Sequence, residues 1–240
     1  ELYQGTSMSS PHTAGAGALL SAVFPDWTVA QVKSALMLTA EHDNLLKEDM
    51  QTPADLFDFG AGRVDLEMTA LTGLTMDETY ENMVAANPAE GGDMQTLNIP
   101  SLYNNLCVGG CEWTRTFTSV AEITATYTAV APDWITVEPA SFEIAPGATQ
   151  VVTFTADVTG LTADEWQFAR VYFETDAVLE SPYEYLFLPL IMNGTGTASG
   201  GTMPTQSIVI PDRPLPDLSV PVAVLPVGSN IPEFVTFETH

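Results

Sequence analysis

Basic residues are scarce in this 240-residue chain, and their scarcity argues against two classes of partner. The sequence holds 6 Lys and Arg against 31 Asp and Glu, which gives a formal net charge of -25 at pH 7. Nucleic acids and anionic membranes are both bound through clustered cations. We therefore expect no nucleic-acid partner and no membrane partner. The acidic residues are spread along the whole chain, which indicates a solubilising surface suited to salty or extracellular surroundings.

Long apolar runs are also missing, because no stretch of eighteen or more apolar residues occurs and a transmembrane helix is therefore not expected. A basic region followed by an apolar stretch, the mark of a signal peptide, is not visible at the start. The sequence begins at Glu1 in the middle of a motif and has the character of a fragment of a longer product. Its 45% hydrophobic residues are typical of globular protein, and its length suits one large domain or two ordinary ones.

Cysteine is limited to Cys107 and Cys111, in the stretch Cys-Val-Gly-Gly-Cys. Two cysteines do not make a zinc site, and the histidines His12, His42 and His240 lie far away in sequence. The short, glycine-containing separation can bend tightly enough for a local disulfide, with free buried thiols as the alternative. A disulfide would place the protein in an oxidising compartment.

Residues 1–75 are predicted to be helical. Thr28 and Gln31 have the spacing of a capping box, and apolar residues follow at helical intervals, so a helix is expected from 28 to about 41. Residues 57–65 have the composition of a glycine-punctuated turn. Asp65 is the expected N-cap of a short helix over 66–71.

From about residue 95 the pattern changes to short segments in which apolar and polar residues alternate. Strands are predicted at 96–99, 113–118, 123–128, 134–137, 150–156, 169–174 and 185–191. Seven short strands over 95–194 fit a fibronectin-III- or immunoglobulin-like sandwich, with 76–94 as the connection to it. Residues 195–240 are first Gly/Ser-rich and then Pro-rich, which suits a linker or the start of a further module.

The opening stretch Gly5-Thr-Ser-Met-Ser-Ser-Pro-His-Thr-Ala-Gly15 places a serine at the tip of a helix whose body is mostly Gly and Ala. A serine hydroxyl needs an adjacent base and a site for the oxyanion before it can attack a peptide carbonyl. At a helix N-terminus the unpaired N–H groups and the positive end of the dipole can supply that oxyanion site. Gly5 permits a tight approach to the helix, and Pro11 is tolerated near its first turn.

This stretch resembles the nucleophile segment of the subtilisin-like serine proteases, and it departs from the family signature only at Thr13, where Val is commoner. The resemblance continues in order through 24–40, which looks like the next helix of the family, and 59–65, which looks like its closing Gly-x-Gly turn. It covers residues 1 to about 73. The β region is similar, with weaker signals, to the fibronectin-III-like domain that follows the catalytic domain in many secreted members.

The resemblance implies a fold class of an α/β remnant, formed by the C-terminal helices of a catalytic domain over 1–75, followed by an all-β sandwich. It implies that Ser7 is the nucleophile and that its backbone N–H is an oxyanion donor. The catalytic base of the family lies on another helix earlier in the chain, so His12 is expected to be structural. The motif-supporting residues are Gly5, Thr6, Met8, Pro11, His12 and Gly15.

The family order is Asp, His, oxyanion Asn and then Ser, and only six residues precede Ser7 here. The resemblance therefore implies the C-terminal portion of a secreted or cell-surface serine endopeptidase that acts on polypeptides and is inert without its upstream part. We expect that part, or another surface, to cover the apolar faces of Val29, Val32 and Leu36. The alternatives are a β-sandwich module for structure or adhesion that keeps a protease relic, and a degenerate protease that binds without cutting.

Calcium is common in this family, but no Asp-x-Asp-x-Asp-Gly loop occurs in the sequence. No cofactor is therefore assigned, and a calcium site made from scattered carboxylates stays open.

Overall fold

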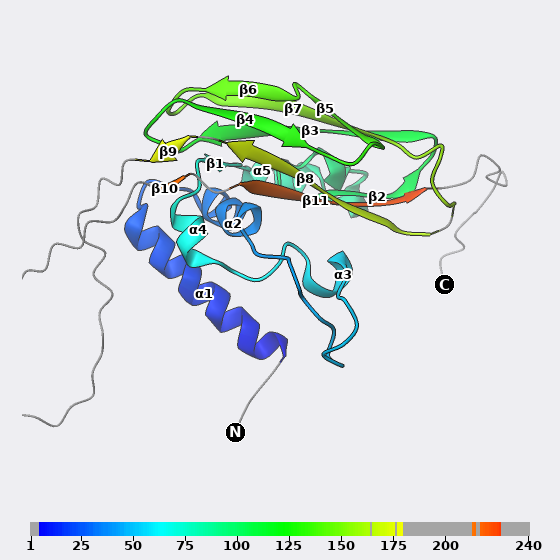
Figure 1. Cartoon of the computed structure of the whole chain (residues 1–240), viewed down its shortest axis with the longest axis horizontal. Coiled ribbons are helices and arrows are strands. Elements are labelled where there is room, and N and C mark those ends of the chain that lie inside the picture. Colours follow the sequence, from blue (N-terminus) through cyan, green and yellow to red (C-terminus); the bar gives the residue numbers. More distant parts are fainter. Residues whose placement is uncertain (1–4, 164, 176, 180–212, 215–216, 227–240) are drawn as a thin grey trace, which may run out of the picture.

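Two β-sheets packed face to face form the larger part of the chain, and helices lie against the outer face of one of them (Figure 1). The computed structural model describes residues 5–163, 165–175, 177–179, 213–214 and 217–226. We call residues 5–72 the helical segment. We call the two packed sheets together the β domain.

The helical segment contains α1 (Thr6–Val23), α2 (Val29–Leu38), α3 (Leu56–Phe59) and α4 (Leu66–Ala70). The connection to the β domain contains α5 (Tyr80–Ala85) and the 3₁₀ turns η1 (Pro88–Glu90) and η2 (Met94–Thr96). Among the described residues, no helix has the length and apolar character required to cross a membrane.

One sheet has the order β1-β3-β7-β5, and the other has the order β2-β11-β8-β4-β6. The strands of the first sheet are β1 (Leu74–Thr75), β3 (Gly110–Ser119), β7 (Thr149–Asp157) and β5 (Ile135–Glu138). Those of the second are β2 (Leu102–Cys107), β11 (Leu218–Pro226), β8 (Gln167–Thr175), β4 (Ala125–Val130) and β6 (Ser141–Ile144). A separate pair joins β9 (Val178–Leu179) to β10 (Arg213–Pro214).

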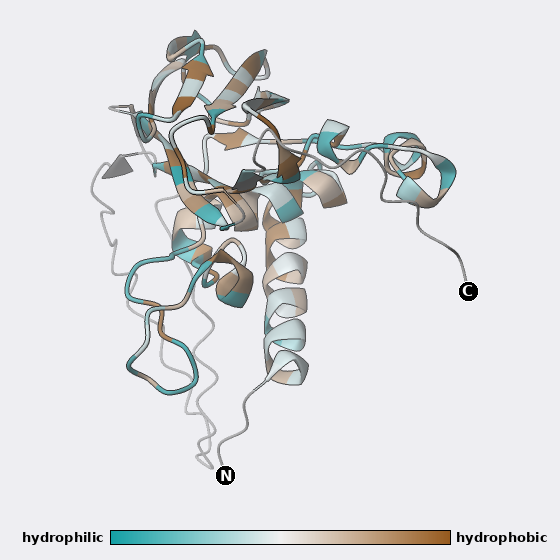
Figure 2. Cartoon of the chain, turned by 90° about the vertical axis from the view of Figure 1, so that its right-hand side faces the viewer, coloured by the Kyte–Doolittle hydropathy of each residue, from teal (hydrophilic) through white to brown (hydrophobic). Residues whose placement is uncertain are grey.

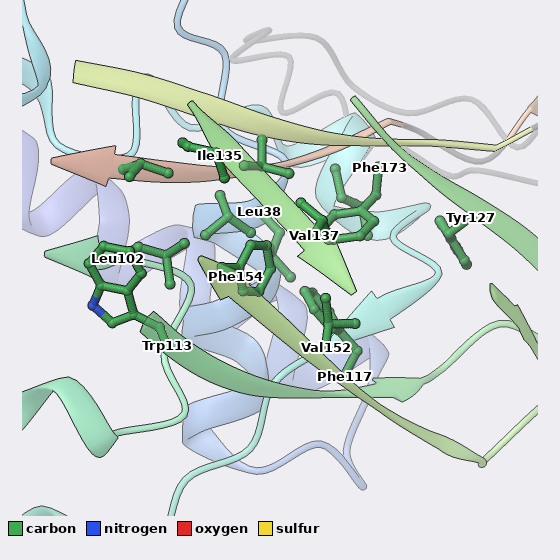
Figure 3. Packing of buried hydrophobic residues seen from close by; sticks show 14 of the residues in the cluster. Leu38, Leu102, Trp113, Phe117, Tyr127, Ile135, Val137, Val152, Phe154 and Phe173 are labelled. Carbon is green, nitrogen blue, oxygen red and sulfur yellow. The ribbon is translucent and has the colours of Figure 1, made fainter. Parts of the chain in front are cut away.

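Alternation of side chains explains how the two sheets bury their inner faces. In β5 the burial pattern alternates strictly, with Ile135 and Val137 buried and Thr136 and Glu138 exposed. In β7, Val152 and Phe154 point inward in the same way. A period of two places every second residue on one face of a strand, so polar residues between them reach the surface. Figure 3 shows the resulting core, in which aromatic and β-branched side chains of both sheets meet.

Two of the predicted helix starts are confirmed in detail. The Thr28 hydroxyl accepts from the Gln31 N–H at 3.1 Å, and the Gln31 side chain accepts from the Thr28 N–H at 2.9 Å, which is the capping box. The Asp65 side chain accepts from the Met68 N–H at the start of α4. The one-turn helix α3 departs from the prediction of a turn over 57–65.

The expected strands at 113–118, 123–128, 134–137, 150–156 and 169–174 correspond to β3, β4, β5, β7 and β8. The strand expected at 96–99 is wrong, since η2 ends at Thr96 and β2 begins only at Leu102. The side chain and carbonyl of Asp93 accept hydrogen bonds from Gln95 and Thr96, which favours a tight turn over an extended strand. The strand expected at 185–191 lies outside the described residues.

Strand β11 lies inside the second sheet, between β2, to which it is parallel, and β8, to which it is antiparallel. Its Val220, Val222 and Val224 are fully buried. The β domain therefore continues past residue 194, where the composition had suggested a linker or a further module. The many prolines in this part of the sequence argue against a strand. Each proline, however, removes only its own N–H from the hydrogen bonds between neighbouring strands.

Helix α2 joins the helical segment to the β domain. Leu38 at its end is 1% exposed and belongs to the same buried cluster as Trp113 and Phe154 (Figure 3). The Ser34 hydroxyl accepts from the Met76 N–H at 2.8 Å, next to β1. Hydrogen bonds and a shared core thus connect the two parts.

The expected covering of the helices is only partly found. Val32 and Leu36 are buried, and they pack with Ala16 and Leu20 of α1, whereas Val29 is 88% exposed. Most of α1 is exposed, and Figure 2 shows it extending away from the sheets as a pale, weakly hydrophobic rod. The opening helix is therefore not buried under a sheet within the described residues.

Candidate nucleophile segment

The N-terminus of α1 carries the serine that the sequence pattern selected. Gly5 is the N-cap with φ of 120°, a backbone conformation that glycine adopts without steric cost. The N–H groups of Met8 and Ser9 donate to the Gly5 carbonyl at 3.0 and 3.2 Å and begin the helix. The amides of Thr6 and Ser7 precede these first intrahelical donors.

Ser7 is exposed, and no side chain caps the helix at Gly5. The end of α1 therefore presents a hydroxyl and early helix amides to the surroundings. The positive end of the dipole of this 18-residue helix lies at its N-terminus, where these amides are. Such a site can stabilise negative charge that develops on an oxygen close to Ser7.

The side chains of Ser9, His12 and Thr13 bond to the backbone of their own helix. The Nδ1 atom of His12 lies 2.6 Å from the Met8 carbonyl oxygen, and the Thr13 hydroxyl donates to the Ser9 carbonyl at 3.1 Å. Within the described part of the chain, no base is hydrogen-bonded to Ser7. The arrangement therefore leaves the Ser7 hydroxyl and the first helix amides accessible at one end of α1.

The small residues of α1 leave its body open. A Cβ atom added at Gly15 or at Gly17 would meet nothing within 4 Å. The two glycines are thus compatible with close approach of another backbone, although the described residues place none there.

The closing turn at 59–63 lies against Glu41, three residues after the end of α2. Glu41 and Arg63 exchange backbone hydrogen bonds of 2.8 and 2.6 Å, and their side chains form an ion pair. Gly62 has φ of 135°, and a Cβ there would lie 2.3 Å from the Glu41 carbonyl oxygen. Only glycine fits this contact, so the turn is fixed directly beneath the end of α2.

The two cysteines are joined, as predicted, by a disulfide that spans Cα atoms 5.5 Å apart at the turn between β2 and β3. Across the described ranges, no group of three or more His, Cys, Asp or Glu lies together in a way that could hold a metal ion.

Sequence reasoning missed the contact between the helical segment and strand β8. Arg170 donates to the Ala61 carbonyl, and the hydroxyl of Tyr172 lies 2.9 Å from Nε2 of His42. No motif signalled these contacts, because they join positions more than 100 residues apart.

An accessible serine at the N-terminus of a glycine- and alanine-rich helix is compatible with the nucleophile of a serine hydrolase, which needs a base beside it. Residues 1–62 match the family model described as the subtilase family. Subtilisin-like protease SBT2.5 of Arabidopsis thaliana is 31% identical over 196 residues, which cover 67% of this chain and 24% of that protein. Subtilisin-like protease SBT1.7 of the same plant is 33% identical over 193 residues, covering 65% and 25%.

The chain belongs to the subtilase family, and it spans about a quarter of the length of these curated relatives. Among solved structures, an MSP-domain protein like family member of Caenorhabditis elegans, SSP-19, matches 52% of this chain and 94% of its own with 10% identity and a TM-score of 0.31. The fibronectin-III-like architecture of the β domain stays a prediction.

Proposed function

We propose that this chain is the C-terminal portion of a secreted subtilisin-like serine endopeptidase and that Ser7 is its nucleophile. The observation that carries the proposal is the exposed Ser7 in the first turn of α1, directly after a glycine N-cap with φ of 120°. The Gly-Thr-Ser-Met motif at this turn lies inside the region that matches the subtilase family.

In the proposed reaction, the Ser7 oxygen attacks the carbonyl carbon of a peptide bond while its proton passes to a histidine supplied by the upstream part. The carbonyl oxygen becomes an oxyanion that the Ser7 N–H stabilises, together with an upstream asparagine. One such donor contributes on the order of 3 kcal/mol to transition-state stabilisation. The histidine returns the proton to the leaving amine, and water then hydrolyses the acyl-enzyme ester by the same route.

The upstream part also accounts for the open helix. We infer that it packs along the exposed body of α1, where Gly15 and Gly17 leave room for close backbone approach. The chain by itself is inert in this proposal, because a nucleophile without its base loses roughly 10⁶-fold in rate. The disulfide and the acidic surface support a secreted or cell-surface location.

Cleavage of an unstructured fluorogenic polypeptide by the full-length protein tests this proposal. Ser7→Ala should lower kcat by at least 10⁴-fold, whereas Ser10→Ala, an exposed serine one turn further along α1, should keep near-normal activity. The 240-residue chain alone should cleave nothing. Equal activity of the Ser7→Ala and unaltered proteins would refute the assignment of the nucleophile.

A further inference from the structure

Strand β8 and the residue just before it present a row of four large side chains on the outer face of the second sheet. Ala169, Val171 and Phe173 face the core of the β domain, and the latter two are completely buried. Residues at intervals of two share one face of a strand, so Phe168, Arg170 and Tyr172 project from the opposite face. Trp166, just before the strand, continues this outward row.

Each member of the row contacts the helical segment. The Phe57 ring packs edge-on against Trp166 and Phe168, with centroid separations of 4.9 and 5.1 Å. Two residues further along, Arg170 contacts the turn after α3, and Tyr172 then reaches His42 at 2.9 Å.

Arg170 is the polar centre of this row. One terminal nitrogen, Nη2, donates to the Ala61 carbonyl at 2.9 Å, and the other, Nη1, donates to the Ser219 hydroxyl of β11 at 3.2 Å. Its guanidinium carbon lies 5.4 Å from the centre of the Phe59 ring. A planar fork can satisfy both partners and the ring together, whereas a lysine ammonium cannot reproduce that geometry.

We propose that Arg170 is a positioning residue through which the β domain holds the nucleophile segment in place. The expected effect of Arg170 on the activity of Ser7 rests on the proposed function. The β domain is then an integral part of the protease and not an appended module.

The contacts form a continuous path from Arg170 to α1. Ala61 lies in the closing turn, which is paired to Glu41 through Arg63 and through the close approach of Gly62. Glu41 follows the end of α2, and α2 packs on α1 through Val32 and Leu36.

Ser7 is nine residues before Ala16, the nearest buried residue of α1, so it lies about 14 Å further along the helix axis. A small tilt of α1 at its contact with α2 therefore becomes a larger displacement at Ser7. A misplacement of about 1 Å can cost 10²-fold in rate.

Amide hydrogen exchange in the 240-residue chain tests whether Arg170 holds the closing turn at 59–63, and it requires no enzymatic activity. In Arg170→Met we expect the amides of residues 57–63 to exchange at least tenfold faster, with unchanged exchange in β3 and β7. Lys33→Met removes an exposed cation from α2 and serves as the matched control, with no effect on residues 57–63. Unaltered exchange of residues 57–63 in Arg170→Met would overturn the proposal.

If Arg170→Met does not fold, Phe59→Leu provides the second variant. It keeps an apolar side chain and removes the ring beneath the guanidinium, and it should accelerate the same amides. Normal exchange of residues 57–63 in a folded Phe59→Leu would count equally against the role of this contact.

Kinetics of the full-length protein test the consequence for Ser7. The concentration of active sites is first determined by titration with a fluorophosphonate. Arg170→Met should then lower kcat at least tenfold at unchanged KM. The kcat of Arg170→Lys should lie between that of Arg170→Met and that of the unaltered protein. A kcat within twofold of normal would reject the positioning role. If the unaltered full-length protein has no activity, the proposed function fails, whereas the exchange experiment still decides whether Arg170 docks the turn.

Discussion

Replacing Leu38 with Ala should destabilise the helical segment and the β domain together. Leu38 is 1% exposed and packs in the core of the β domain although it belongs to α2 (Figure 3). The substitution removes three carbon atoms, which is about 2.4 kcal/mol of transfer free energy at roughly 0.8 kcal/mol each. The cavity left behind adds to this, so we expect the free energy of unfolding to fall by about 3 kcal/mol.

Urea denaturation followed by two probes measures this effect. With Trp27 of the helical segment replaced by Phe in every variant, tryptophan fluorescence reports on the β domain, which holds buried Trp113, and circular dichroism at 222 nm reports on the helices. Both midpoints should shift by the same amount, because one core links the two parts. Leu19→Ala on α1, where the leucine is 60% exposed, should change stability by less than about 0.5 kcal/mol. A shift of the helical transition alone would refute the shared core.

Three further predictions follow from individual side chains. Tyr127→Phe should raise the free energy of unfolding by about 1 kcal/mol in thermal melts, because the buried Tyr127 hydroxyl finds no hydrogen-bond partner among the described residues. Tyr172→Phe is the matched control: it removes a hydroxyl that contacts His42, so it should not raise the free energy of unfolding. Arg115→Met should cost about 3 kcal/mol in urea denaturation, because buried Arg115 donates to four backbone carbonyls around the connection and β3. Hydrogen bonds from the Thr52 hydroxyl and from the amides of Thr52 and Gln51 lower the pKa of Asp49 from 3.8 to about 2. The stabilisation of the folded state by the Asp49 carboxylate should therefore be complete above about pH 4 and be lost as the pH falls through 2. An NMR titration of the Asp49 carboxyl group measures this pKa, and a midpoint near 4 would contradict the prediction.

The local elements of the helical segment could be predicted because their signals lie within a few residues. Thr28 and Gln31 reach each other across one turn, and Asp65 reaches the amide three residues later. Alternation likewise located β3, β5 and β7. The nucleophile motif is equally local, since Gly5 and Ser7 are fixed by the first turn of α1.

Long-range pairing could not be predicted in this way. Strand β11 follows β8 by more than 40 residues and contains Pro221, so composition indicated a linker, yet pairing with β2 and β8 decides its conformation. Arg170 lies in an ordinary alternating strand, and nothing around it indicates that its partner is Ala61. The exposure of α1 also depends on what surrounds it and not on its own residues.

The most direct test of the account is to label the full-length protein with a fluorophosphonate and to map the modified peptide by mass spectrometry. We expect one adduct, on the oxygen of Ser7, that disappears in Ser7→Ala and persists in Ser10→Ala. An adduct on a different residue, or none at all, would contradict the claim that this helix tip carries a nucleophile.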